Sequence, residues 1–182
     1  MKKKVLIFLF IILAIAVFFR FWQLDSIPPG LYPDEAINGN EAALALESKD
    51  FRIFYPENNG REGLFINLIA LSFSIFGISV WAMKLVPAII GLLTVLGLYF
   101  LVKELFKDLR ITTKDGKREP TSNNLPPAEI IALLSSFFLA VSFWHINFSR
   151  IGFRAILTPF CLVWGFYFLL RATRMTQIEK AC

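Results

Sequence analysis

Histidine and cysteine are scarce in this chain, which has one histidine and two cysteines among 182 residues. Zinc sites are usually built from three or four His, Cys or carboxylate ligands, so the sequence gives no support for a metal centre of that kind. The two cysteines, Cys161 in an apolar run and Cys182 at the last position, do not indicate a disulfide. Basic residues are not gathered in a stretch with interleaved aromatics, so we expect no nucleic-acid partner.

Apolar side chains are what the chain has in excess. Hydrophobic residues make up 56% of it, phenylalanine alone contributes 20 residues, and the mean hydropathy is +0.60. A soluble domain of this size carries fewer apolar residues. The composition therefore predicts an all-α integral membrane protein.

Four apolar stretches are predicted to be transmembrane helices. A helix needs about 20 predominantly apolar residues to cross the hydrocarbon core of a bilayer. The predicted spans are residues 5–22, 81–102, 130–148 and 155–170. A retained first helix is favoured over a cleaved signal peptide, because its small-x-small triplet, Ala14 to Ala16, lies inside the apolar run.

The segments between the spans decide the topology. Residues 23–62 are predicted to form a polar external loop, with a surface helix at its centre from Pro33 to Glu47. Residues 63–77 are apolar but short, so they either cross the membrane or lie at its surface. Six basic residues between positions 103 and 118 favour a cytoplasmic loop at 103–129, and hence an interfacial helix at 63–77.

This topology describes a multi-pass protein of the plasma membrane with a cytoplasmic N-terminus. It places twelve basic residues inside and seven outside, in agreement with the positive-inside rule. Four spans and one surface helix leave little room for a buried active site. We therefore expect the chain to be the N-terminal part of a longer polytopic protein.

Two adjacent carboxylates in the external loop, Asp34 and Glu35, are the candidate catalytic residues. Neighbouring side chains on a helix project about 100° apart, so one carboxylate can face a substrate while the other orients it. The same residues after Pro33 also fit an ordinary helix start. A divalent cation held by both acids is a further alternative, because hard cations prefer oxygen ligands, but two acids are too few to define a metal site.

Three arginines, Arg61, Arg150 and Arg154, lie on the predicted outer side despite the positive-inside bias. The planar guanidinium group suits phosphate, because its donors form a fork that matches two phosphate oxygens. Snorkelling of a long side chain to the interface explains the same positions without any ligand. The sequence alone leaves both interpretations open.

The order of these features resembles a known family. A basic start and first span, then Asp34-Glu35, then Arg61-Glu62 before a short apolar helix, then Ser149-Arg150 between later spans, are similar to the N-terminal part of polyprenyl-phosphate-dependent membrane glycosyltransferases. That group has the GT-C fold and includes protein O-mannosyltransferases and lipid A aminoarabinose transferases. The resemblance implies an inverting transfer of a sugar from a polyprenyl-phosphate carrier to a hydroxyl of a lipid or protein acceptor, on the external face.

The resemblance also implies roles for individual residues. Asp34 would be the base with Glu35 in support, and Arg61, together with Arg150 and Arg154, would contact the carrier phosphate. The chain departs from the mannosyltransferase pattern after Arg150, because Ala155 stands where a second acid is expected, and this favours a looser bacterial or archaeal branch with an unknown sugar. The competing hypothesis is a small non-enzymatic polytopic membrane protein that binds lipid or assists assembly of a partner.

Overall fold

Helices dominate the computed structural model, which describes residues 3–57, 59–107 and 127–181. Helix accounts for 78% of the structure, which confirms the predicted all-α class. The helices are α1 (Lys3–Phe21), α2 (Pro33–Ser48), α3 (Gly63–Phe76), α4 (Val80–Leu105), α5 (Pro127–Ala140), α6 (Phe143–Arg150) and α7 (Leu157–Ala181), with a 3-10 turn at Arg154–Ile156. The sequence did not predict two short strands, β1 (Phe54–Tyr55) and β2 (Arg61–Glu62), which pair antiparallel before α3.

Among the described residues, three helices are long and apolar enough to cross a membrane: α1, α4 and the stretch from Arg154 to Arg174. A fourth crossing results if α5 and α6, which meet at an angle of 57°, form one broken span. The expected number of about four membrane-spanning segments therefore agrees with the structure in helix length and composition. Helix α3, with 14 residues, is shorter than these candidates.

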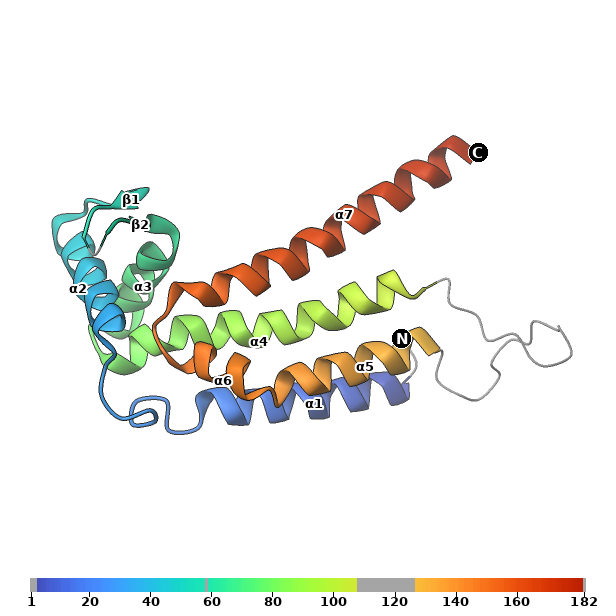
Figure 1. Ribbon diagram of the computed structural model, residues 1–182, viewed down its shortest axis with the longest axis horizontal. Helices are drawn as coiled ribbons and strands as arrows, with labels where there is room; N and C mark the ends of the chain where they lie inside the picture. Colours follow the sequence, from blue (N-terminus) through green and yellow to red (C-terminus); the bar gives the residue numbers. More distant parts are fainter. Residues whose placement is uncertain (1–2, 58, 108–126, 182) are drawn as a thin grey trace, which may run out of the picture.

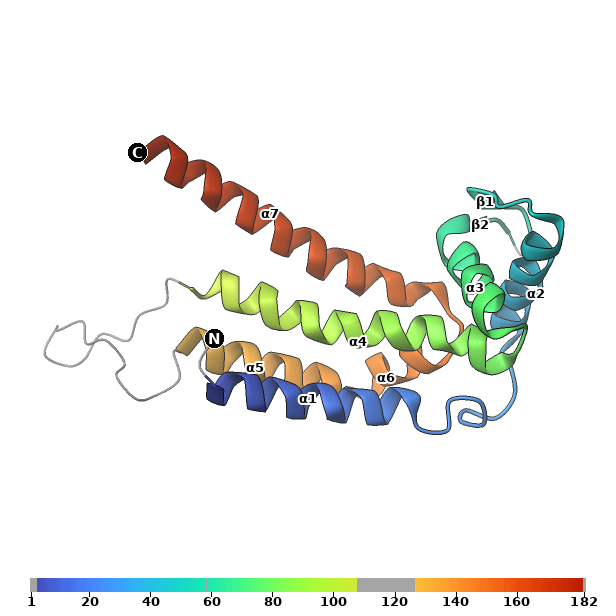
Figure 2. The ribbon, with the colours of Figure 1, turned by 180° about the vertical axis from the view of Figure 1, so that it is seen from behind.

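The long helices lie lengthwise beside one another, and α4 is at their centre (Figure 1). It packs against α1, α3, α5, α6 and α7. Helices α2 and α3 lie with the two strands at one end of the bundle, which we call the α2–α3 end, and the view from behind agrees (Figure 2). The start of α1, the end of α4 and the end of α7 lie at the opposite end.

The third predicted span, residues 130–148, is not one continuous helix. Helix α5 ends at Ala140 and α6 begins at Phe143, although no proline or glycine lies at the break. The fully buried Arg20 of α1 donates to the carbonyl oxygens of Leu139 and Ala140, at 3.3 and 3.0 Å. The last carbonyls of a helix lack intrahelical partners, and this arginine supplies donors that make the break tolerable in apolar surroundings.

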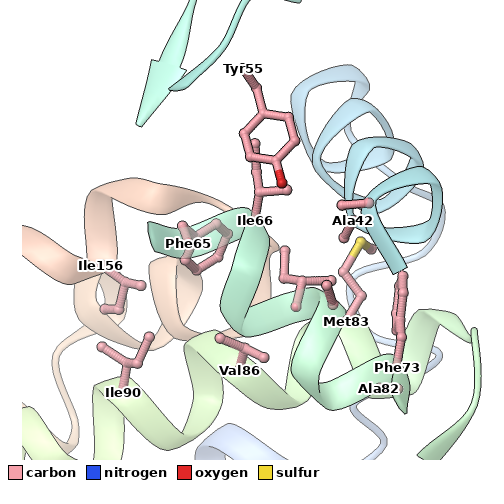
Figure 3. Close-up of a cluster of buried hydrophobic side chains, with 13 residues drawn as sticks. Ala42, Tyr55, Phe65, Ile66, Phe73, Ala82, Met83, Val86, Ile90 and Ile156 are labelled. Atoms are coloured by element: carbon pink, nitrogen blue, oxygen red, sulfur yellow. The ribbon is translucent and has the colours of Figure 1, made fainter. Parts of the chain in front are cut away.

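An apolar cluster fixes the α2–α3 end to the N-terminal part of α4 (Figure 3). Phe65 and Ile66 of α3 are almost fully buried, and they share the cluster with Ala42 of α2 and Met83 of α4. Tyr55 of β1 joins them. Burial of such side chains stabilises a fold by about 1.5–3 kcal/mol each. The hairpin, α2 and α3 are therefore held together and position the polar side chains described next.

Candidate functional site

Asp34 and Arg61 are brought together at the α2–α3 end. Asp34 lies in the first turn of α2, which begins with Pro33. Arg61 on β2 donates from Nη2 to Oδ1 of Asp34 and from Nη1 to the carbonyl oxygen of Asp34, both at 3.0 Å. The side chain of Arg61 is 5% exposed and that of Asp34 is 33% exposed. The carboxylate therefore reaches solvent while the arginine behind it is buried.

Glu35 points away from solvent, into the protein. It is 1% exposed. Its Oε1 accepts a hydrogen bond from the backbone N–H of Gly152 at 2.9 Å, and its Oε2 accepts one from the backbone N–H of Tyr32 at 3.3 Å. A Cβ at position 152 would lie 2.8 Å from Cγ of Glu35, so the close approach requires glycine. Glu35 supports the site by holding α2 against the turn after α6.

Asn38 belongs to the same cluster, although the sequence analysis did not single it out. It is 1% exposed. Its Oδ1 accepts a hydrogen bond from Nη1 of Arg61, and its Nδ2 donates to the carbonyl oxygen of Gly152 at 2.8 Å. One signal was present in the sequence, because Asn38 follows Asp34 by four residues and so lies on the same helix face. Its amide links Arg61 to the turn that carries Arg154.

Arg154 lies at the solvent edge of this cluster. Its Nη1 donates to Oε2 of Glu62 at 2.5 Å, and the two side chains are 38% and 78% exposed. The pKa of the Glu62 carboxyl is lowered from its usual range, first by a hydrogen bond from its own backbone N–H and then by the positive charge of Arg154. Glu62 is thus ionised at neutral pH, the form that pairs with Arg154.

Arg150 lies apart from Asp34 and Arg61. Its guanidinium donates to the carbonyl oxygens of Phe19, Trp22, Gln23 and Ile27, at distances from 2.7 to 3.2 Å. These carbonyls belong to the last turn of α1 and to the loop that follows it. Arg150 therefore caps α1, as Arg20 caps α5, and we do not assign it to the carrier phosphate as the sequence analysis expected.

Two neighbouring cavities open beside these residues. A polar pocket of about 250 Å³ is lined by Asp34, Asn38, Asn59, Gly60, Arg61, Phe153 and Arg154. A larger groove of about 640 Å³ lies between α3 and α7, and its apolar lining includes Leu64, Phe65, Leu157 and Leu162. Phe153 and Arg154 line both cavities. The polar pocket thus adjoins an apolar groove, with a guanidinium at the junction.

The arrangement of the two acids does not fit a divalent cation. Asp34 pairs with Arg61, and both oxygens of Glu35 accept backbone N–H groups. In the described part of the chain, no three His, Cys, Asp or Glu side chains converge as a metal site would require. We therefore derive no step through a metal ion.

No family model, curated protein or solved structure matches this chain. The chemistry of the site is accordingly argued from its own residues, cavities and charges.

Proposed function

We propose that this chain is the N-terminal part of a GT-C-like membrane glycosyltransferase that moves a sugar from a polyprenyl-phosphate carrier to an acceptor hydroxyl. One observation carries the proposal. The polar pocket lined by Asp34 lies beside an apolar groove, and Arg154 lines both. A lipid-linked sugar phosphate has the same order of parts, with a polar sugar, then an anionic phosphate, then an apolar chain.

The groove between α3 and α7 suits the polyprenyl chain. Leu64 and Phe65 of α3 face it from one side, and Leu157 and Leu162 of α7 face it from the other. Each CH₂ group removed from water contributes about 0.8 kcal/mol. Burial of the polyprenyl chain in the groove would supply binding affinity in this way, and the polar pocket would select the sugar.

Arg154 would hold the carrier phosphate. It lies between the groove and the pocket and is partly exposed, so an anionic ligand can reach its guanidinium. A guanidinium binds phosphate oxygens through two parallel hydrogen bonds. Arg61 lies deeper and acts through Asp34, whose carboxylate it orients.

The chemistry then follows from these positions. Asp34 accepts the proton of the acceptor hydroxyl as that oxygen attacks the anomeric carbon on the face opposite the phosphate. The bond between the anomeric carbon and the phosphate oxygen breaks, and its electrons remain on the phosphate. Arg154 stabilises the charge that develops there. Attack on the opposite face inverts the anomeric configuration.

The charge distribution supports an external site in a multi-pass plasma-membrane protein. At the bundle end opposite the site lie Lys3 and Lys4 of α1, Lys103 of α4 and Arg174 of α7. Basic residues accumulate on the cytoplasmic side of membrane proteins. On this rule the opposite end is cytoplasmic, and Asp34 and Arg154 face outward.

Replacement of Asp34 by asparagine tests the proposal. Asparagine keeps an oxygen that can accept the hydrogen bond from Arg61, but it cannot take a proton, so transfer should fall by about 10²- to 10⁴-fold. Asp25→Asn, in an exposed loop, is the matched control and should transfer like the wild type. The assay follows labelled sugar from a panel of polyprenyl-phosphate donors, in membranes that contain equal levels of the full-length protein and its variants.

Two outcomes would contradict the proposal. If Asp34→Asn transfers sugar at the wild-type rate, Asp34 is not the general base. No transfer by the full-length wild-type protein with any donor of the panel would favour the non-enzymatic alternative, in which Asp34 and Glu35 serve only to start helix α2.

A further inference from the structure

The ion pair between Glu62 and Arg154 differs from the other polar contacts of the site. Arg61, Glu35 and Asn38 are nearly fully buried, and their hydrogen bonds join separate segments of the chain. Arg154 is 38% exposed, and the carboxylate that it contacts is 78% exposed. An exposed ion pair contributes about 0–1 kcal/mol to stability. The pair is therefore easily exchanged for another partner.

The ion pair between Glu62 and Arg154 lies where a ligand phosphate would bind. Arg154 lines the polar pocket and the apolar groove, whereas Glu62 lines the groove and not the pocket. When Glu62 is paired with Arg154, its carboxylate occupies the guanidinium at the junction of the two cavities, where a ligand phosphate would lie. A phosphate offers more oxygens to the same donors than one carboxylate oxygen does. Glu62 and a phosphate would thus compete for one guanidinium.

The released carboxylate would keep favourable surroundings. Glu62 directly precedes α3 at its N-cap position, beside the first N–H groups of that helix. The start of a helix also favours a negative charge, because its first N–H groups carry partial positive charge. Loss of Arg154 therefore does not leave Glu62 as an isolated charge.

We propose that Glu62 is a resident counter-ion that occupies Arg154 in the empty site and is displaced by the phosphate of a lipid carrier. The identity of the ligand rests on the proposed function; the displacement itself rests on the exposed pair at the junction of the two cavities. Glu62 sets the affinity of the site for the phosphate group, because each binding event must first break its bond to Arg154.

Binding measurements on charge-neutral variants test this competition. The probe is phosphatidylcholine vesicles that contain a polyprenyl monophosphate, with inorganic phosphate as a second ligand that lacks the chain. Glu62→Gln should bind the vesicles about 2- to 5-fold more tightly than the wild type, the factor that corresponds to an exposed ion pair. The matched control is Glu57→Gln, exposed in the turn between β1 and β2, which should not change the affinity.

Arg154→Gln provides the second arm. Arg154→Gln should weaken binding of the vesicles. In the Arg154→Gln background, Glu62→Gln should have no further effect on the affinity, because Glu62 affects binding only by pairing with Arg154. Tighter binding of the vesicles but not of inorganic phosphate identifies the lipid carrier as the source. Tighter binding of both identifies phosphate itself as the recognised group.

The results separate this inference from the proposed function. Equal or weaker vesicle binding by Glu62→Gln, measured on protein with wild-type thermal stability, overturns the displacement even if sugar transfer is observed. Tighter binding by Glu62→Gln, together with no sugar transfer by the full-length protein from any donor, supports the displacement and contradicts the proposed glycosyltransferase activity. The displacement is also overturned if Glu62→Gln raises the vesicle affinity as much in the Arg154→Gln background as it does in the wild type.

Discussion

Replacement of Glu35 by glutamine should destabilise the protein while leaving transfer per folded molecule close to the wild-type value. Glu35 and Asp34 are adjacent in the sequence, but only Asp34 reaches the polar pocket. Glu35 instead accepts the N–H groups of Gly152 and Tyr32. The change thus separates a carboxylate that holds the structure from one that takes part in the chemistry.

The size of the effect follows from the two hydrogen bonds. Hydrogen bonds to charged groups contribute about 1.5–3 kcal/mol, and a buried donor left without an acceptor costs about 1–3 kcal/mol. Glutamine retains one oxygen for Gly152 but turns an NH₂ group toward Tyr32, so we expect a loss of about 2 kcal/mol. For a protein of this length that corresponds to a midpoint lower by about 4–8 °C. Glu35→Ala removes both acceptors and should cost more.

Thermal unfolding in detergent, followed by tryptophan fluorescence, measures this loss, and the transfer assay is run on the same samples. Glu47→Gln is the control, because Glu47 is exposed on the same helix, α2. A Glu35→Gln protein with the wild-type midpoint but without transfer would refute the reasoning. Glu35 would then belong to the chemistry and not to the packing.

Two further predictions concern the frame around the site. Arg150→Gln should lower the yield of folded protein and its thermal midpoint, because the carbonyls at the end of α1 and in the following loop lose their donors. Arg150→Lys should restore part of both. If Arg150→Gln has the wild-type size-exclusion profile, Arg150 is not needed for folding, and a role in ligand binding is favoured. In a background lacking both native cysteines, Asn59→Cys should react with an impermeant maleimide in intact cells and Lys107→Cys only after lysis. Labelling of Lys107→Cys in intact cells would place that end of the bundle outside.

The sequence by itself determined the class of the protein and the approximate extent of its main helices. Long apolar runs predict membrane-length helices because composition and length suffice for that inference. The predicted span 81–102 lies within α4, and the predicted surface helix from Pro33 to Glu47 matches α2. In α2 a proline at the first position and two acids in the first turn are local signals. These features depend on residues that are close in the chain.

Only the tertiary structure decided what the polar residues do. Asn38 and Gly152 are 114 residues apart, and Arg20 and Ala140 are 120 residues apart, yet each pair shares a hydrogen bond. Arg150 and Arg154 look equivalent in the sequence, but one is bonded to the backbone after α1 and the other lies at the edge of two cavities. The physical reason is that buried polar groups must find partners wherever the packing places them, and a one-dimensional pattern does not specify that packing.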